Sequence, residues 1–389
     1  MTALAKLRLG IYIPVFDPSP HGVGVYIDEV CSRLAARAPT TLFTDGLGPL
    51  PEWTGSLVVL SPEVRLRVLR DGARVGRRLA RLLFLHLQVR RELKQRGVDV
   101  LFCPAQDGLI APPVPQVLVV HDLTALHTRQ AQPVMTATYQ GSVVRAVAVS
   151  SQLVVAVSQS TARDVRHHFR VPENRLRVVY EGFDRAHFFP ASSDAIDAVR
   201  ARYQLPTKFF LYAGTYSPHK NLDTLICGLQ NLDSASPEWV LALAGRTDSG
   251  DFAAFLSACD AAGIVDRVRP LGYVPTSDLA CLMSACSAFV FPSLYEGFGL
   301  SVLEAMACGA YVIASNRASI PEVVGDAGVL LDPQDVSAWR NALSVCLVGT
   351  DSVLALKEAA RRRSLTFSWD ATVDQIAELL EELLGQPAG

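Results

Sequence analysis

The sequence lacks several features that would place it in a specialised class of protein. Its 389 residues contain no apolar run of the roughly 18 to 20 residues that a transmembrane helix needs. The eight cysteines form no Cys-x-x-Cys pair and no metal-ligand spacing, and no Asp-x-Asp pair lies near the candidate loops. The amino-terminal residues turn β-like after a few basic positions, so we expect a core strand there and not a signal peptide. These absences predict a cytoplasmic protein with buried reduced thiols, no metal site and no cofactor.

A full dinucleotide-binding fingerprint is also missing. Gly22 and Gly24 stand between the first expected strand and its helix, but the third glycine of a Gly-x-Gly-x-x-Gly motif is absent. The two glycines still permit close approach of the backbone to a ligand. A nicotinamide-dependent dehydrogenase is therefore disfavoured.

What is present is an alternation of short apolar runs with helical periods, which is typical of an α/β protein with parallel sheets. Half of the residues are apolar, which suits strands that are buried on both faces. We expect strands at residues 7–15, 40–44, 98–104, 114–121, 152–158, 175–182, 208–215, 239–245, 268–272, 288–293, 310–315 and 327–332.

The length and the repeated pattern predict two doubly wound, Rossmann-like domains that face each other across a cleft. Residues 181–195 are rich in turn formers and interrupt the pattern, so they are the expected linker. The predicted parts are an acceptor-side domain, 1–184, a donor-side domain, 185–370, and a carboxyl-terminal helix, 371–389. We expect this last helix to pack back on the first domain.

The net charge of −2 is unevenly distributed. Residues 63–96 hold ten arginines and one lysine against three acids, and their apolar positions recur at helical spacing. A basic amphipathic helix can lie on an anionic membrane, and it can equally be a solvated face of the first domain. Phe84 is the only Phe, Tyr or Trp among these arginines, and this lack of aromatic residues argues against nucleic acid.

The stretch EGFGLSVLE, residues 296–304, places two carboxylates around a glycine-containing turn that follows a strand. Ser301 is a candidate helix cap, and Glu304 follows it at capping-box spacing. The start of that helix offers amide donors to an anion, and carboxylates accept hydrogen bonds from paired hydroxyls. Glu296 and Glu304 are therefore candidates for holding sugar rings, although each has a purely structural alternative as a loop acid or a cap.

Two further strand ends carry polar residues. LYAGTYSPHKN places Gly214, Thr215, His219 and Lys220 after a strand, and the lysine can neutralise a phosphate as a point charge. A neighbouring strand ends before Arg246, which is a second candidate cation. The alternative for these cations is an ordinary solvated surface.

In the first half, VLVVHDLTALH ends a strand with His121 and Asp122. A histidine at this place can donate a hydrogen bond or polarise a substrate group, and it can equally be a satisfied structural residue.

Together these segments resemble the retaining glycosyltransferases of family four, which have the GT-B fold. The family shows a Glu, seven residues and a second Glu, here Glu296 and Glu304. AGTYSPHKN resembles its diphosphate loop, and VVHDLTALH, VAVSQSTARDV and VVYEGFDRAHF resemble further segments in order. The resemblance covers roughly residues 10–370.

The resemblance implies a metal-independent enzyme that moves a sugar from a nucleotide-diphosphate sugar to a hydroxyl acceptor, with retention, in polysaccharide or glycolipid assembly. Glu296, His121 and Lys220 would be the catalytic residues: Glu296 would hold the donor sugar, His121 would contact that sugar, and Lys220 would neutralise the leaving diphosphate. Glu304 would bind the ribose hydroxyls, and Val274 would lie near the base. The implied donor-binding set is Glu304, Gly297, Phe298, Gly299, Leu300, Ser301, Gly214, Thr215, His219, Arg246 and Val274. The implied acceptor or phosphate loop contains Gly22, Gly24 and Asp122.

The sequence departs from the family pattern at two positions, because His219 and Thr215 stand where family members often have arginine. This departure predicts a weaker or pH-sensitive diphosphate site. It also leaves open a non-catalytic subunit that binds a nucleotide sugar. A GT-B phosphorylase or an epimerase is a further alternative, although a phosphorylase would need a pyridoxal lysine. The expected partners are a nucleotide sugar and a sugar or lipid-linked acceptor, at the inner face of the membrane if the basic segment binds lipid.

Overall fold

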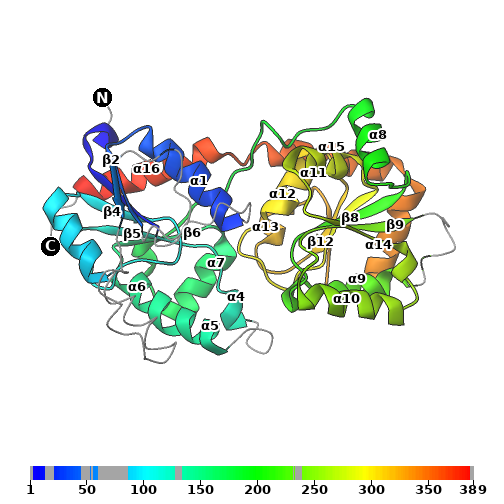
Figure 1. Cartoon of the computed structure of the whole chain (residues 1–389), viewed down its shortest axis with the longest axis horizontal. Coiled ribbons are helices and arrows are strands. Elements are labelled where there is room, and N and C mark those ends of the chain that lie inside the picture. The colour runs from blue at the N-terminus through cyan, green and yellow to red at the C-terminus, as the bar shows by residue number, and fades with distance from the viewer. Residues whose placement is uncertain are drawn as a thin grey trace. The chain divides into compact units, whose positions relative to one another are not determined.

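The computed structural model describes residues 3–13, 22–44, 53, 56–59, 86–127, 134–230, 232 and 239–385. Contacts divide them into two compact units (Figure 1). The first unit comprises the described residues of Met1–Leu126, Pro133–Glu181 and Trp369–Gly389, and the second those of His127–Gln132 and Gly182–Ser368. Each unit is an α/β body with its own parallel sheet.

The first unit is built on a seven-stranded parallel sheet with the order β3-β2-β1-β4-β5-β6-β7. The strands are short and mostly buried on both faces, as their continuous apolar sequences predict. Their bounds are β1 Leu9–Tyr12, β2 Thr40–Thr44, β3 Ser56–Val59, β4 Val100–Cys103, β5 Gln116–Val120, β6 Leu153–Ala156 and β7 Leu176–Val178.

Helices cover both faces of this sheet. On one face α1 (Gly22–Ala35) packs against α16 (Trp369–Gly385), so the end of the chain returns to the first unit (Figure 1). On the other face, residues from the helical stretch 86–96 and from the region 144–171 join one apolar core cluster. The remaining helical segments are η1 Ala3–Lys6, α4 Thr124–His127, α5 Val134–Tyr139, the π-helix η3 Gln140–Val144, α6 Arg145–Ser150, α7 Gln159–Asp164, the π-helix η4 Val165–Phe169 and η5 Glu173–Arg175.

The second unit has a six-stranded parallel sheet with the order β10-β9-β8-β11-β12-β13. Its strands are β8 Phe209–Ala213, β9 Val240–Ala244, β10 Val268–Gly272, β11 Ala288–Phe291, β12 Val312–Ser315 and β13 Val329–Leu331. Two helix layers enclose it: α9, α10 and α14 on one side, and α11, α12, α13 and α15 on the other (Figure 1). The helical bounds are α8 Ser193–Arg202, η6 Pro218–Lys220, α9 Leu222–Leu229, α10 Gly250–Ala261, η7 Val265–Arg267, α11 Thr276–Ala285, α12 Leu300–Ala307, α13 Ile320–Val324, α14 Val336–Val348 and α15 Asp351–Ser364.

Both sheets reverse their strand order beside the first strand of the unit. In the first unit β2 and β4 flank β1, and in the second unit β9 and β11 flank β8. In open parallel sheets, ligands bind outside the carboxyl ends of the strands at this reversal. The carboxyl ends of β1 and β4, and those of β8 and β11, are therefore the places where this rule expects a ligand.

The sequence predicted twelve of the thirteen described strands and missed one. The missed strand is β3, a four-residue strand at the edge of the first sheet. Most of the basic segment 63–96 lies outside the described residues, which include only its end from 86 onward. Among the described residues, no helix has both the length and the apolar composition to cross a bilayer.

All eight cysteines are free, and burial differs among them. Six are buried, Cys281 is half-buried and Cys227 is exposed. The expectation that all the thiols are buried is therefore wrong for Cys227, which lies on the amphipathic helix α9.

Gly245 follows β9 at a point where two strand ends approach each other closely. A Cβ atom there would lie 2.2 Å from the carbonyl oxygen of Gly214, the residue that follows β8. No side chain fits without moving the backbone, so this glycine keeps β8 and β9 together at the carboxyl edge of the sheet.

We expect Gly245→Ala to lower the free energy of unfolding by about 1 to 3 kcal/mol, because the added methyl group clashes with backbone and not with a flexible side chain. Urea denaturation measures the change. Gly250→Ala is the matched control: a Cβ at this first residue of α10 meets nothing within 4 Å, so stability should be unchanged or slightly higher. Equal stability of both variants would contradict the assigned role of Gly245.

Candidate functional site

The loops after β8 and β11 bring together two of the residues that the sequence singled out. Lys220 Nζ lies 2.6 Å from Glu296 Oε1, and each side chain is 14% exposed. Lys220 also lies over the ring of Phe291, the last residue of β11, at 5.4 Å from the ring centre. A cation and a carboxylate are thus paired at the strand reversal of the second sheet.

Backbone and side-chain hydrogen bonds hold these two loops in register. The Leu294 amide donates to the carbonyl of His219 at 2.8 Å. Asn221 adopts a left-handed backbone (φ 54°) and its Nδ2 donates to the carbonyls of Pro292 and Pro333 at 3.1 and 2.9 Å. The buried hydroxyl of Ser319 lies 3.0 Å from the carbonyl oxygen of Glu296. The positions of Lys220 and Glu296 are therefore fixed by their backbones and not only by their mutual attraction.

Helix α12 begins directly after this loop, at Leu300. Gly299 precedes it with φ 107°, and a Cβ there would lie 2.7 Å from Ile320 Cδ1, so glycine is required. No side chain caps the helix, and Ser301 is its second residue. The predicted capping role of Ser301 is therefore wrong, and Glu304 lies one turn into the helix. The first amides of α12 are left without side-chain caps, which suits an anion.

The other predicted donor-side residues differ in their exposure and in their hydrogen-bond partners. Thr215 is exposed, and its carbonyl accepts a hydrogen bond from the hydroxyl of Tyr212. Arg246 is exposed and forms a two-bond pair with Asp248, at 3.1 and 2.7 Å. His219 lies in the short helix η6 beside Lys220, and Val274 is 7% exposed. Arg246 thus already has an acidic partner, whereas the lysine and glutamate pair occupies the strand reversal.

Gly214 follows β8, Gly297 and Phe298 lie between β11 and α12, and Leu300 is the first residue of α12. Their donor-binding roles stay predictions. Phe298 is buried and contacts Phe367 edge to face. Its side chain therefore packs in the interior, and only its backbone belongs to the loop surface.

His121, at the end of β5, is buried and both of its ring nitrogens have partners. Nε2 lies 2.8 Å from the carbonyl oxygen of Pro104, and Nδ1 lies 3.3 Å from Glu181 Oε1. The ring of Tyr26 contacts it edge to face at 4.7 Å. A role of His121 toward a donor sugar stays a prediction, and its contacts give it a structural role in the first unit.

The pKa of His121 is raised although the ring is buried. Burial alone lowers this pKa, but the hydrogen bond and charge of Glu181 outweigh it, with smaller contributions from the Pro104 carbonyl and Asp122. These contacts thus favour the protonated imidazole more than in a free histidine, and a protonated His121 forms a buried ion pair with Glu181.

The remaining first-unit predictions need one correction. Gly22 and Gly24 lie in the first turn of α1 and not in a loop before it. Asp122 turns its carboxylate back on the chain, where Oδ1 accepts from the amide of Thr124 at 2.8 Å.

Sequence reasoning missed Glu181 and Ser319. The sequence assigned Glu181 only to the linker. Glu181 comes soon after β7, however, and therefore lies at the same sheet edge as His121. This position could have identified Glu181 as a partner of His121. Ser319 has no such signal, because its role depends on a contact across 23 residues of chain.

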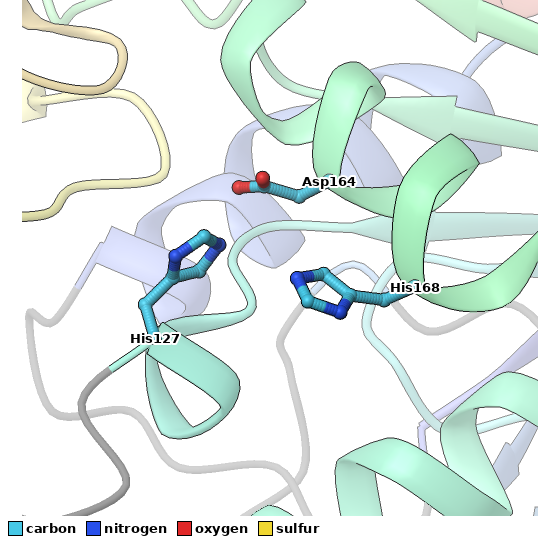
Figure 2. A group of neighbouring side chains, drawn as sticks. All are labelled: His127, Asp164 and His168. Atoms are coloured by element: carbon cyan, nitrogen blue, oxygen red, sulfur yellow. The ribbon is translucent and has the colours of Figure 1, made fainter.

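One group of described residues has the composition of a metal site. Ligand atoms of His127, Asp164 and His168 lie within 4.8 Å of one another, and Figure 2 shows the three side chains gathered together. Imidazoles and carboxylates are ligands of Zn²⁺, but the same groups pair by charge when the imidazoles are protonated. The composition alone assigns no ion.

Two family models match this chain, one in each half. The model described as Glycosyltransferase Family 4 matches residues 20–187, and that described as Glycosyl transferases group 1 matches residues 196–363. The O-antigen chain mannosyltransferase B of Escherichia coli is 32% identical over 271 residues, which are 67% of this chain and 68% of that protein. The chain therefore belongs to these glycosyltransferases.

Two other relatives are matched over a smaller share of their own length. The serotype-specific mannosyltransferase WbdA of Escherichia coli is 31% identical over 61% of this chain and 30% of its own length. The D-inositol 3-phosphate glycosyltransferase of Salinispora arenicola is 34% identical over 61% of this chain and 56% of its own length. The chain thus spans less than two thirds of each of these two relatives.

Two solved structures each match 97% of the chain and establish the predicted GT-B fold. Anabaena Alr3699/HepE, in complex with UDP and glucose, has a TM-score of 0.76 at 20% identity, over 97% of this chain and 100% of that one. Sucrose-phosphate synthase from Thermosynechococcus elongatus has a TM-score of 0.75 at 20% identity, over 97% and 99%.

We expect Glu181→Gln to lower the pKa of His121, because the substitution removes the charge that keeps the imidazole protonated. The loss of stability should be about 2 kcal/mol. Since a raised histidine pKa stabilises the fold below about pH 6.5, the loss should be largest there and shrink as pH rises through the raised pKa.

NMR titration of the His121 ring and denaturation at several pH values measure both effects. Glu173→Gln, at an exposed glutamate of the same unit, is the control and should change neither. An unchanged His121 titration in Glu181→Gln would show that the pair does not hold the proton.

Proposed function

We propose that this glycosyltransferase moves a hexosyl group, with retention of configuration, from a nucleotide-diphosphate sugar to a hydroxyl acceptor in polysaccharide or glycolipid assembly. The observation that carries the proposal is the Lys220–Glu296 pair at the strand reversal of the second sheet, beside the uncapped start of α12. Two of the relatives are mannosyltransferases, which supports the sugar-transfer class.

In the proposed reaction the bond between the anomeric carbon and the diphosphate oxygen breaks, and a bond to the acceptor oxygen forms on the same face. The acceptor proton passes to the departing phosphate oxygen. Charge grows on the diphosphate as it leaves, and Lys220 with the first amides of α12 stabilises this charge without requiring a metal ion. Glu304, one turn further along α12, binds the ribose hydroxyls.

The ion pair also suggests how the donor is recognised. Before the donor binds, Lys220 and Glu296 satisfy each other, which avoids an unpaired and mostly buried charge. A nucleotide sugar can replace both partners, because its phosphate binds the lysine and its sugar hydroxyls donate hydrogen bonds to the glutamate. A nucleoside diphosphate without the sugar satisfies only the lysine.

This exchange predicts opposite effects of two substitutions on the binding of bare nucleoside diphosphates. Lys220→Ala should weaken binding about tenfold or more, because the phosphate loses its cation. Glu296→Gln should tighten it several-fold, because the lysine no longer has a competing carboxylate. Calorimetry with UDP, GDP, ADP and dTDP, and with their mannose or glucose derivatives, measures these effects and identifies the donor base.

Lys208→Ala is the matched control, since Lys208 lies at the opposite, amino-terminal end of β8. A wild-type protein that binds no nucleotide would overturn the proposed function. Tight binding of a nucleotide sugar without release of free nucleotide or transfer to any acceptor would favour the non-catalytic subunit instead.

We further propose that the acceptor is presented at an anionic membrane surface, to which the basic segment 63–96 binds. The support is the excess of eight positive charges in this segment. Within the described part, Arg90 donates to the carbonyl oxygens of Ile110 and Ala111, so that arginine serves the fold.

Reversing Arg65, Arg67 and Arg70 to glutamate should abolish co-sedimentation with phosphatidylglycerol vesicles, because the attraction to the surface is electrostatic. Reversing Arg361 and Arg362 of α15 is the control and should leave sedimentation intact. Sedimentation that is unchanged by the first set of reversals would refute the membrane contact.

A further inference from the structure

The short helix α13 of the second unit connects the loop of Glu296 to Arg363, a side chain of α15 (Figure 1). Ser319 directly precedes α13, and its hydroxyl is buried. This hydroxyl lies 3.0 Å from the carbonyl oxygen of Glu296 and 2.8 Å from that of Phe298. The start of α13 is therefore joined to the loop that carries the candidate sugar-binding carboxylate.

The other end of α13 is held by Arg363. The last carbonyls of a helix have no partner inside the helix. Arg363 satisfies two of them, because Nε donates to the carbonyl of Val323 at 2.6 Å and Nη2 donates to that of Glu322 at 2.7 Å. Hydrogen bonds from a charged donor are stronger than those between neutral groups. The guanidinium therefore fixes the end of a helix that has only five residues.

Glycine permits close packing at both ends of α13. Gly325 follows the helix with φ 58°, and a Cβ there would lie 2.7 Å from Arg363 Cζ. At the start of the helix, a Cβ at Gly299 would lie 2.7 Å from Ile320 Cδ1. Neither contact leaves space for a side chain, so α13 has little freedom to move between the loop and α15.

A second contact joins Arg363 to the same loop through two aromatic rings. Arg363 Cζ lies 6.0 Å from the ring centre of Phe367, and Phe367 contacts Phe298 edge to face at 5.8 Å. Phe367 is itself held in place, because Arg185 Nη2 donates to its carbonyl at 3.0 Å. Arg363 thus reaches the loop of Phe298 by two routes, one through α13 and one through Phe367.

We propose that Arg363 is a positioning residue for the donor sugar. It holds α13 and Phe367 against the loop 296–299, and it thereby fixes the backbone from which Glu296 reaches the sugar hydroxyls. Lys220, which binds the diphosphate, belongs to a different segment, η6. This inference rests on the proposed function and adds to it a residue on which recognition of the sugar depends, although that residue contacts no ligand.

Calorimetry on Arg363→Met tests the inference, because methionine keeps an apolar stem and removes every donor of the guanidinium. The probes are UDP with UDP-glucose and GDP with GDP-mannose. The measured quantity is the sugar preference, which is the dissociation constant of the nucleoside diphosphate divided by that of its nucleotide sugar. Arg363→Met should lower this preference about tenfold, because misplacing a binding group by a small distance removes much of its contribution. Binding of the bare nucleoside diphosphate should change little.

A purely structural role predicts a different result. If Arg363 only stabilises α13 and α15, Arg363→Met lowers the melting temperature but leaves the sugar preference at its wild-type value below the unfolding transition. That result would overturn the inference. Arg362→Met is the matched control: Arg362 is the exposed neighbour on α15, and its substitution should change neither quantity.

A double-mutant cycle with Ser319→Ala tests the route through α13. Ser319→Ala removes the hydroxyl that joins α13 to the loop, so it should also lower the sugar preference. Adding Arg363→Met should then cost less than it does in the wild type, and fully additive losses would overturn this role of α13. Arg363→Lys keeps a charge but lacks the fork of two donating nitrogens, so its sugar preference should lie between those of the wild type and Arg363→Met. It provides the same test if Arg363→Met does not fold.

The outcomes separate this inference from the proposed function. A wild type that prefers nucleotide sugars, together with an unchanged preference in Arg363→Met, would overturn the role of Arg363 and leave the transferase proposal standing. A wild type that binds no nucleotide would overturn the proposed function and this inference with it.

Discussion

The buried ion pair between His121 and Glu181 connects more parts of the first unit than any other polar contact described above. His121 directly follows β5, and Glu181 is the last residue before the chain leaves the unit. Around the pair, Pro104 belongs to the loop after β4, and Thr161 of α7 donates to the carbonyl of His121 at 3.2 Å. The sheet edge that carries the candidate acceptor residues is thus fixed by one charge pair whose two partners lie 60 residues apart.

The return of the chain to the first unit depends on the same region. Tyr26 of α1 lies with its ring between His121 and Trp369, the first residue of α16, at 4.7 and 5.9 Å. Thr372 of α16 donates to the carbonyl of Tyr180, next to Glu181, at 2.8 Å. The exit and re-entry points of the chain are therefore held side by side, and ion pairs such as Arg33–Asp370 continue the contact along α1.

The sequence predicted the strands better than it predicted which strands lie next to each other in a sheet, and the reason is physical. A strand buried on both faces must be continuously apolar, so it is visible in the sequence. The order of strands in a sheet leaves no such trace. Because β8 pairs with β11 and not only with β9, Lys220 meets Glu296 across 76 residues of chain. The sequence could identify both residues as candidates, but their mutual pairing follows from strand order.

The first residue of a helix is also hard to predict from the sequence, because it depends on the backbone conformation of the neighbouring residue. Ser301 has the residue type and spacing of a cap, yet the helix begins at Leu300 because Gly299 adopts a positive φ that other residues rarely adopt. The consequence is chemical as well as geometric. A side-chain cap would have satisfied one of the first amides, whereas no side chain does so in this helix.

The Lys220–Glu296 pair has consequences for selectivity, because its two partners satisfy each other. A ligand must replace both partners to bind without loss, which favours molecules that carry a phosphate and hydroxyls together. A fragment that carries only one of these groups leaves the other partner as an unpaired and mostly buried charge, so this arrangement discriminates against fragments of a ligand.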